Sequence, residues 1–518
     1  MATIADNTVI DRVASSVAAD ELLTDATARD LYSHDVYSTG RQPLGVLRPK
    51  TVEALAAGVA AATSQGLAIV PRGGGMSYTG GYIYNGGDFI LVDTAAMDRI
   101  VEIDPVDMTV TVEAGCTWDA LHRALKPHGL RAKAWGTLSG LRATVGGGMS
   151  QNGVFWGARD GTVSDAALSF EVVLADGTGV STGSDFFRPF GPDLTGLFAG
   201  DTGAFGVKAR IKLRLVRDGT AFAYGSFALD DYAAIFGTMS EIARQGLAAE
   251  NFAFDPFLQS QRMKRDSLSK DAKSLVNMMK SQGSAWKALK EGAKVVAAGR
   301  SFLDDVPFSL HVIAEGRHQP GVDADMKLIE EIAKKHGGRA IDNTIPKILR
   351  ANPFPPPNSM LGPNGERWVP VHGFLPHSKL TTAWESLQAL YEENAEAMAR
   401  HKVEVGAMLA AVSPSVCLTE PVFFWPDARN ALHEDAVETD HLKRLQKFDA
   451  DLEARALVAE LRSKVVDIFH GLGAAHLQIA RTSPLPESHD PKAWELLKAL
   501  KRAVDPKGLM NPGSLGLE

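Results

Sequence analysis

Cysteine is scarce in this chain. Only Cys116 and Cys417 occur among 518 residues, which excludes a disulfide framework and a cysteine-rich zinc or iron–sulfur site. No run of about 18 apolar residues is present, so we expect no membrane-spanning helix. The amino-terminal segment lacks a basic stretch followed by an apolar one, so we expect no secretion signal and a cytoplasmic protein. Basic blocks are also missing, and 54 Lys and Arg against 62 Asp and Glu argue against nucleic-acid binding.

Glycine, by contrast, is abundant, with 49 residues, and three glycine clusters lie before residue 210. Apolar residues make up 45% of the chain and charged residues 22%, which is typical of a globular protein, and the length suits about two to four domains. After residue 220 the sequence changes to charged helical stretches and a proline-rich loop, so we predict a domain boundary there. The three clusters contain residues 73–75, 80–81 and 86–87; residues 146–148, 153, 157 and 161; and residues 200, 203 and 206.

Hydrophobic periodicity predicts an α+β fold. In the first 220 residues, Thr51 caps a predicted helix that Gly66 ends. Strands are predicted there at 67–70, 89–93, 101–103, 109–112, 169–174 and 206–215. Beyond residue 220, the pattern predicts helices at 231–247, 270–298, 323–336, 379–402 and 427–470, and strands at 306–315, 368–375 and 417–425. A strand at 475–480 and a helix at 491–504 follow.

The glycine clusters suit a phosphate-bearing ligand. Consecutive backbone N–H groups without an obstructing Cβ form a concavity that binds phosphate oxygens, and two such loops suit a pyrophosphate. The sequence GGGMS occurs at 73–77 and again at 146–150. Neither copy completes the dinucleotide motif G-x-G-x-x-G, and neither is followed by the Gly-Lys-Ser or Gly-Lys-Thr of a P-loop. We therefore predict a dinucleotide site of another kind, the alternative being that the glycines only form tight turns.

Five motifs occur in one order: PRGGGMSYTGG at 71–81, VEAG at 112–115, ATVGG at 143–147, GAFGV at 203–207 and DPKGLMNPG at 505–513. This series resembles the vanillyl-alcohol oxidase / p-cresol methylhydroxylase (PCMH) flavoprotein family, which includes D-lactate and glycolate dehydrogenases. The resemblance covers residues 45–218 and 475–516 and is weak between them. It implies a two-subdomain PCMH-type FAD-binding domain at 1–220, an α/β cap (substrate) domain at 221–470, and a segment at 471–518 that returns to the FAD domain.

The resemblance also implies which residues bind the cofactor. No histidine stands in the first loop, where many members tether FAD, and residues 137–141 contain no cysteine for a second tether. We therefore expect non-covalent FAD, with a tether from the cap domain left open. The expected pyrophosphate-side residues are Pro71, Arg72, Gly73, Gly74, Gly75, Met76, Ser77, Tyr78, Thr79 and Gly80. Thr144, Val145, Gly146, Gly147, Gly148, Asn152 and Gly153 are expected along the flavin, Gly203, Gly206 and Val207 along the adenine and ribose, and Asn511 near the ring or ribityl chain.

Three residues are the main candidates for the chemistry. His372 and His377 can take a hydroxyl proton, and Arg481 can hold a carboxylate through paired hydrogen bonds. Arg481 follows Ala480, where the phenol-oxidising branch of the family has tyrosine, and its alternative role is a surface salt bridge. The histidines have packing or surface roles as their alternative.

We predict no metal site. The metal-dependent D-lactate branch places its histidines around Gly-Asp-Gly-Asn, and this chain lacks that sequence. A site built from His372, His377, Glu420 and His476 stays an alternative. Lesser candidates for the chemistry are Arg142, Asp160 and Tyr78, and Trp368, Phe423, Phe424 and Trp425 are candidates for an apolar pocket wall or for the core.

The predicted activity is FAD-dependent oxidation of a CH–OH group by hydride transfer, with a D-2-hydroxy acid such as lactate or glycolate as substrate. Arg481 would hold the carboxylate and His372 or His377 would take the proton, with electrons passing to an external acceptor. Oxidase and dehydrogenase are not distinguished. The alternatives are oxidation of phenolic or benzylic, lignin-derived alcohols and, from another class, a non-catalytic dinucleotide-binding protein. The resemblance also implies a homodimer.

Overall fold

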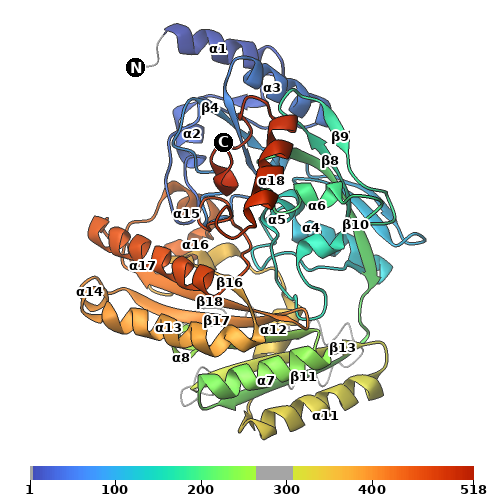
Figure 1. Ribbon diagram of the computed structural model, residues 1–518, viewed down its shortest axis with the longest axis vertical. Coiled ribbons are helices and arrows are strands. Elements are labelled where there is room, and N and C mark those ends of the chain that lie inside the picture. Colours follow the sequence, from blue (N-terminus) through green and yellow to red (C-terminus); the bar gives the residue numbers. More distant parts are fainter. Residues whose placement is uncertain (1–3, 264–306) are drawn as a thin grey trace.

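The computed structural model describes residues 4–263 and 307–518 and contains three β-sheets (Figure 1). The helix predicted at 270–298 lies outside the described residues. In Figure 1 the two sheets formed by the first part of the chain lie in the upper half, and the third sheet with its helices lies in the lower half. Within the described ranges, no helix is both long and apolar enough to cross a bilayer.

The first sheet contains the strand that leads into the first glycine cluster. The strands at 45–47 and 68–72 both pair in parallel with the strand at 89–93. Helix α3 (Val52–Ser64) connects the strands at 45–47 and 68–72. The side chain of Thr51 accepts a hydrogen bond from the Ala54 N–H, and Gly66 follows the helix at φ +76°, which confirms the predicted cap and stop. The strands, in order across the sheet, are β1 (Leu22–Leu23), β2 (Gly45–Leu47), β4 (Phe89–Asp93) and β3 (Ala68–Arg72). Helices α1 (Ile4–Ala14) and α2 (Ala26–Leu31) precede β2.

The second sheet is antiparallel and carries the other two glycine clusters on its connections. Its strands confirm the predictions at 101–103, 109–112, 169–174 and 206–215. They are, in order, β5 (Ile100–Asp104), β6 (Thr109–Glu113), β10 (Val207–Arg217), β8 (Ala167–Val173) and β9 (Gly179–Ser181), with β7 (Leu130–Ala132) paired to β10. Helices α4 (Trp118–Leu125), α5 (Val145–Gln151) and α6 (Leu194–Phe198) connect them.

The third sheet has two different faces. Ala253, Leu409 and Phe423 point to one core cluster shared with the covering helices, whereas Phe252 and Val422 belong to a cluster shared with the second sheet. The sheet thus presents one face to the glycine-rich part of the chain. Its strands, in order, are β14 (Arg339–Ala340), β11 (Ala221–Leu229), β13 (Phe308–Gly316), β12 (Glu250–Phe254), β17 (Glu404–Val412), β18 (Val416–Trp425) and β15 (Arg367–Pro370), with β16 (Gly373–Pro376) paired to β18.

Helices cover the opposite face of this sheet. The predictions at 231–247 and 323–336 are confirmed, but those at 379–402 and 427–470 are each divided. In the first stretch, Asn394 ends one helix and precedes the next. The second stretch contains three helices, separated at 437–438 and 443–451. The helices of this part are α7 (Tyr232–Gln245), α8 (Pro256–Met263), α11 (Gln319–Lys335), α12 (Thr344–Ala351), α13 (Leu380–Glu393), α14 (Ala395–Arg400), α15 (Ala431–Ala436), α16 (Thr439–Leu442) and α17 (Leu452–Gly471).

The carboxyl-terminal segment returns to the first sheet. Helix α18 (Pro491–Val504) confirms its prediction and lies in the upper half of Figure 1, among elements of the first part of the chain. The Ile69 N–H donates to the Leu509 carbonyl at 2.8 Å, and the Asn511 N–H donates to the Ile69 carbonyl at 2.7 Å. The strand predicted at 475–480 is wrong. Ala475 forms one isolated bridge with Phe374, and the backbone then turns through positive φ at Gln478 and Ala480.

Candidate functional site

A cavity of about 270 Å³ lies between the three glycine clusters and the face of the third sheet that is turned toward them. Strand β3 delivers the first cluster to it, α5 contains the second, and the third precedes β10. Of the residues predicted to bind the cofactor, those that line the cavity are Pro71, Arg72, Gly73, Gly74, Gly75, Met76, Ser77, Tyr78, Thr144, Gly146, Gly147, Gly148, Gly153, Gly203, Gly206 and Val207. Thr79, Gly80, Val145, Asn152 and Asn511 are not part of the lining.

The first two clusters touch because they are glycine. A Cβ on Gly74 would lie 1.9 Å from the Arg142 carbonyl oxygen, and one on Gly73 would lie 2.3 Å from Thr144 Oγ1. The sequence predicts that the second cluster is a loop like the first. In the structure it instead forms the beginning of helix α5. Thr144 caps this helix by accepting a hydrogen bond from the Gly147 N–H at 3.1 Å. Glycine here serves close backbone approach, which a wall against a bound ligand requires.

The polar groups around these clusters fit an elongated, anionic ligand with hydrogen-bond donors. Arg72 is buried between the rings of Tyr32 and Tyr82, and its Nε has no partner among the described residues. The buried side-chain oxygens of Gln151 and Asn152 likewise have no partner within the described ranges. Buried polar atoms normally find a partner, so these atoms fit a bound group that supplies both negative charge and N–H or O–H donors.

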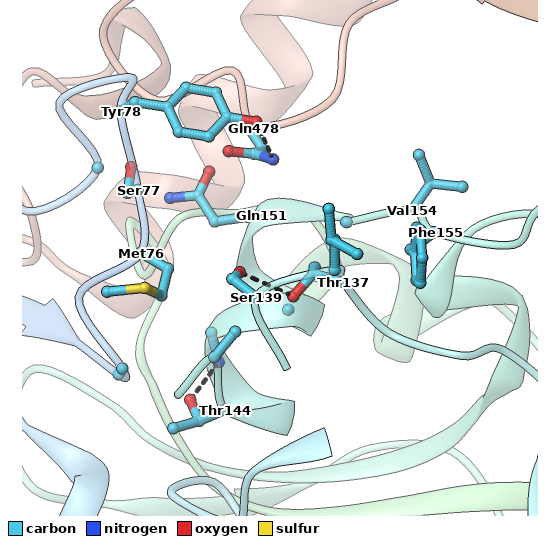
Figure 2. A pocket seen from close by; sticks show the side chains of 18 of the residues that line it. Met76, Ser77, Tyr78, Thr137, Ser139, Thr144, Gln151, Val154, Phe155 and Gln478 are labelled. Atoms are coloured by element: carbon cyan, nitrogen blue, oxygen red, sulfur yellow. Dashed lines mark hydrogen bonds between the residues drawn. The ribbon is translucent and has the colours of Figure 1, made fainter. Parts of the chain in front are cut away.

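A second polar group of residues lies where the first loop meets the third sheet. Figure 2 shows Tyr78 beside Gln478 at one end of the view and Thr144 at the other. Gln478 Nε2 donates to Tyr78 Oη at 3.1 Å, and Tyr78 Oη lies 2.8 Å from Nε2 of His372, between β15 and β16. The Gln478 amide donates to the phenol oxygen, and the tautomer of the imidazole decides which of Tyr78 and His372 donates to the other. Three segments far apart in the sequence thus form one hydrogen-bonded chain at the cavity wall.

The surroundings keep Tyr78 and His372 uncharged. Burial, and then the charges of His476 and Arg462, lower the pKa of His372 to about 3. Burial, and then the carboxylate of Glu420, raise the pKa of Tyr78 well above its ordinary value. Glu420 Oε2 lies 3.9 Å from His372 Nε2, and Glu420 also lines the cavity. At neutral pH the pair is therefore a neutral phenol and a neutral imidazole that share one hydrogen bond.

This depressed pKa predicts an acid-dependent loss of stability. Above pH 6.5 His372 is neutral in both the folded and the unfolded chain. Between pH 6.5 and about 3 the unfolded chain takes up a proton that folded His372 does not, so the free energy of unfolding falls by up to ~1.4 kcal/mol per pH unit from this group. Replacing His372 with asparagine should make this fall shallower in denaturant titrations from pH 7 to 5. The same replacement of exposed His128 should leave the slope as it is, and equal slopes for the two variants would contradict the prediction.

The structure brings none of the three predicted catalytic residues into the lining of the cavity, although His372 contacts Tyr78, which lines it. His377 is bonded to Ser240 Oγ and to the Pro414 carbonyl, both at 2.9 Å. Arg481 donates to the Gly80 carbonyl at 2.8 Å, to Asn511 Oδ1 at 2.8 Å and to the Pro512 carbonyl at 2.7 Å. Neither residue lines the cavity. Arg481 fastens the carboxyl-terminal segment to the first loop and is therefore not available as the anchor for a substrate carboxylate.

The remaining candidates divide between structure and site. Arg142 pairs with Asp435, and Asp160 pairs with buried Arg131, so both have structural roles. Trp368 lines the cavity and meets the Tyr78 ring edge-on, whereas Phe423 and Trp425 belong to the core on the helix-covered side. Because His377 lies elsewhere, the four-residue metal alternative is not assembled. No group of three or more His, Cys, Asp or Glu among the described residues suits a metal ion.

Sequence reasoning missed two residues of this site, Gln478 and Gln151. Gln478 stands in the segment that was predicted as a strand, and its φ of +51° turns its side chain toward Tyr78. Gln151, at the end of α5, lies between these residues and Ser139 in Figure 2. No motif marks either glutamine. Tyr78 and His372 could be found from the sequence, because Tyr78 follows the first glycine triplet and His372 lies in the apolar stretch 368–375 that was predicted as a strand.

Two domain families match the chain in the expected order. Residues 43–183 match the FAD binding domain, and residues 464–515 match the C-terminal domain of FAD linked oxidases. The chain is 25% identical over 99% of its length to a probable mitochondrial D-lactate dehydrogenase of Danio rerio, covering 93% of that protein. It is 30% identical over 39% of its length to glycolate oxidase subunit GlcD of Bacillus subtilis, where the match spans 43% of the relative.

Solved structures share the fold over the whole chain. p-Cresol methylhydroxylase with bound substrate superimposes with a TM-score of 0.73 at 17% identity, covering 100% of this chain and 98% of that one. An alkyldihydroxyacetonephosphate synthase superimposes with a TM-score of 0.70 at 16% identity, covering 98% and 84% of the two chains. Residues 43–183 thus match an FAD binding domain and residues 464–515 the C-terminal domain of FAD linked oxidases, FAD is the cofactor, and the whole chain has the fold of p-cresol methylhydroxylase.

Proposed function

We propose that this protein is an FAD-dependent oxidase or dehydrogenase that oxidises the CH–OH group of an alcohol. The observation that carries the proposal is the contact between Tyr78, which lines the cavity together with Gln478, and uncharged His372, which lies behind the lining. Bound FAD supplies the hydride acceptor. The protein must bind the alcohol, orient its C–H bond and remove the hydroxyl proton.

The residues present fit FAD. Arg72 and the backbone of Gly73, Gly74 and Gly75 would hold the pyrophosphate, because they offer positive charge and N–H groups in one buried concavity. The unpartnered oxygen of Gln151, which lines the cavity, would accept from the cofactor, whereas Asn152 lies outside the lining. The other lining residues of the predicted set would shape its walls, whereas Thr79, Gly80, Val145 and Asn511 support them from behind. Among the described lining residues there is no histidine or cysteine, which supports non-covalent FAD.

Tyr78 and His372 would remove the proton. A substrate hydroxyl that donates to Tyr78 Oη would release the phenol proton to His372 Nε2, which lies 2.8 Å away, in the tautomer that leaves the Nε2 lone pair free to accept. In the net reaction the alcohol carbon loses a hydride, the hydroxyl loses a proton to this pair, and a carbonyl forms. Trp368 holds the Tyr78 ring in place through an edge-on contact with a centroid distance of 5.6 Å.

Two substrate classes have support. The relatives named D-lactate dehydrogenase and glycolate oxidase support a D-2-hydroxy acid. The apolar side chains of Val154, Phe155 and Leu418 in the cavity wall support the second class, phenolic or benzylic alcohols. An external electron acceptor, a homodimer and a cytoplasmic location stay part of the proposal.

Anaerobic titration of the purified yellow protein tests the function. An alcohol substrate should bleach the flavin absorbance near 450 nm and be recovered as the corresponding aldehyde or ketone. Acid precipitation of the same sample should release the flavin into the supernatant if it is non-covalent. A protein that keeps its flavin but is reduced by no alcohol of either class would instead be the non-catalytic dinucleotide-binding protein.

A further inference from the structure

The third sheet forms one wall of the cavity, here called the cavity face. Most of its side chains are apolar, and its two carboxyl groups stand far apart. Glu420 lies in one row across the sheet with Met408 and Phe254. Glu250 lies on the same strand as Phe254 but four residues from it, which is about 13 Å along the strand. The cavity face consists of Glu250, Phe252, Phe254, Met408, Ala410, Val412, Leu418, Glu420 and Val422.

The end of the cavity face at Glu420, here called the Tyr78 end, holds the residues already described. Tyr78 Oη and Glu420 Oε2 lie 2.8 and 3.9 Å from the same atom, Nε2 of His372. Buried Arg462 reaches this end as well, because its Nη2 donates to the Tyr78 carbonyl at 3.2 Å. Its positive charge acts on both Tyr78 and His372. The charged groups of the Tyr78 end therefore act on one another, and Glu250 has different neighbours.

Glu250 is only 8% exposed, yet its carboxyl group forms no hydrogen bond or ion pair within the described part of the chain. The two cations that act on it are engaged by other carboxylates. Arg131 Nη2 donates to Asp160 Oδ2 at 2.9 Å. Arg159 Nη2 donates to Glu315 Oε1 at 3.2 Å. Burial, and then the charge of Asp160, raise the pKa of Glu250 well above its ordinary value. At neutral pH its carboxyl group is therefore uncharged and can donate a hydrogen bond as well as accept one.

A second polar group without a partner lies at the Glu250 end. Trp156 lines the cavity, and its ring meets the Phe252 ring edge-on with 5.5 Å between the centroids. Phe252 stands two residues from Glu250 on the same strand, so both side chains point to the cavity face. Trp156 Nε1 is buried and has no hydrogen-bond partner among the described residues. An indole N–H only donates, and buried polar groups normally have partners, so this end suits a ligand oxygen that accepts.

We propose that the Glu250 carboxyl group binds an uncharged oxygen of the substrate, such as a carbonyl, at the end far from the reacting hydroxyl. The inference rests on the proposed oxidation and adds a second anchor for its substrate. The Tyr78 end takes the hydroxyl whose carbon is oxidised, and Phe252 and Met408 contact the apolar body of the molecule. The O–H of Glu250 donates to the distant oxygen, and Trp156 Nε1 is the second donor there. An alcohol as small as glycolate is too short to reach both ends, so the inference names a larger one.

Two pairs of alcohols of nearly equal shape test this on the FAD-loaded protein. In each pair one member has an acetyl group, and the other an isopropyl group, opposite the chain that bears the hydroxyl. The pairs are 4-acetylbenzyl alcohol with 4-isopropylbenzyl alcohol, and 3-(4-acetylphenyl)-1-propanol with 3-(4-isopropylphenyl)-1-propanol. Calorimetry gives each Kd on the anaerobically reduced protein, whose flavin cannot accept a hydride. In the wild type, the acetyl member of the pair whose length fits should bind about tenfold more tightly.

Two variants of Glu250 and one of its neighbour complete the test. E250L should abolish the acetyl preference, and E250Q should keep it, because the glutamine amide is uncharged and donates. Val412 provides the matched control, since the register that pairs Phe252 with Ala410, continued by two residues, sets Val412 beside Glu250. V412A removes apolar surface at the same end and should weaken both members alike. FAD content should equal that of the wild type in all three variants.

The outcomes separate the two proposals. Equal binding of both members of each pair to the wild type, or an acetyl preference that E250L retains, overturns the inference. A wild type that prefers the isopropyl member, with E250Q reversing this preference, also overturns it, because Glu250 would then be ionised. Loss of FAD from E250L without a change in preference assigns Glu250 to the cofactor instead and overturns it too. An acetyl preference that depends on Glu250, in a protein whose oxidised flavin no alcohol reduces, supports the inference and overturns the proposed oxidation.

Discussion

Replacing Tyr78 with phenylalanine should slow anaerobic reduction of the flavin by an alcohol by about 100-fold and leave the bound FAD in place. The ring keeps its edge-on contact with Trp368, but the hydroxyl that links Gln478 to His372 is lost. Without it, the substrate proton has no short path to the imidazole. Stopped-flow absorbance measures the reduction rate, and the ratio of flavin to protein absorbance measures FAD content.

A second tyrosine supplies the control for this change. The Tyr84 hydroxyl accepts from the Gly87 N–H at 3.2 Å in a loop outside the cavity lining. Tyr84→Phe therefore removes the same atom and should leave the reduction rate unchanged. If Tyr78→Phe reduces its flavin as fast as Tyr84→Phe does, Tyr78 takes no part in proton removal.

Replacing Gly74 with alanine should weaken FAD binding by about 100-fold, which corresponds to about 2.8 kcal/mol. The added Cβ would lie 1.9 Å from the Arg142 carbonyl oxygen, so the first loop and the segment before α5 must separate. That separation widens the concavity that we propose for the pyrophosphate. Strain of this kind also costs about 1–3 kcal/mol of folding stability, so thermal unfolding of the flavin-free protein should accompany the FAD titration.

Gly87 is the matched position for that experiment. It is the last glycine of the same cluster, and an added Cβ there meets no atom within 4 Å. Gly87→Ala should therefore bind FAD like the wild type. Normal FAD affinity in Gly74→Ala, with a folded protein, would show that close contact between the two segments is not needed for the cofactor.

The histidine pair shows what sequence reasoning left open. His372 lies in the link before β16, and His377 begins the short 3₁₀ turn after it, so strand alternation does not relate their side chains. One histidine meets Tyr78, and the other meets Ser240 and Pro414. Which of them contacts the first loop depends on how the third sheet packs against that loop.

Arg481 and Gln478 show a different limit. The apolar stretch from 475 to 480 reads as a strand, and a strand would have extended toward Arg481. Positive φ at Gln478 and Ala480 instead bends the chain, so that Gln478 reaches Tyr78 while Arg481 turns to Gly80 and Asn511. These conformations are uncommon for residues with a Cβ and are held by contacts with other segments, so local propensity does not predict them.

The sequence by itself indicated a dinucleotide site and the class of fold, because the glycine clusters and most strands of the first 220 residues are local signals that a short window contains, and the resemblance to a flavoprotein family implied FAD. The helix at α5 and the strands β11, β12 and β17 escaped prediction. Three glycines, which disfavour helices, stand in α5, alanine, which favours helices over strands, is frequent in β11 and β17, and β12 has only five residues. Only the tertiary structure decided which charged side chains reach the cavity. It places Glu420 in the lining and keeps Arg481 out of it, because the direction of a side chain follows from strand register and from backbone turns that distant segments hold in place.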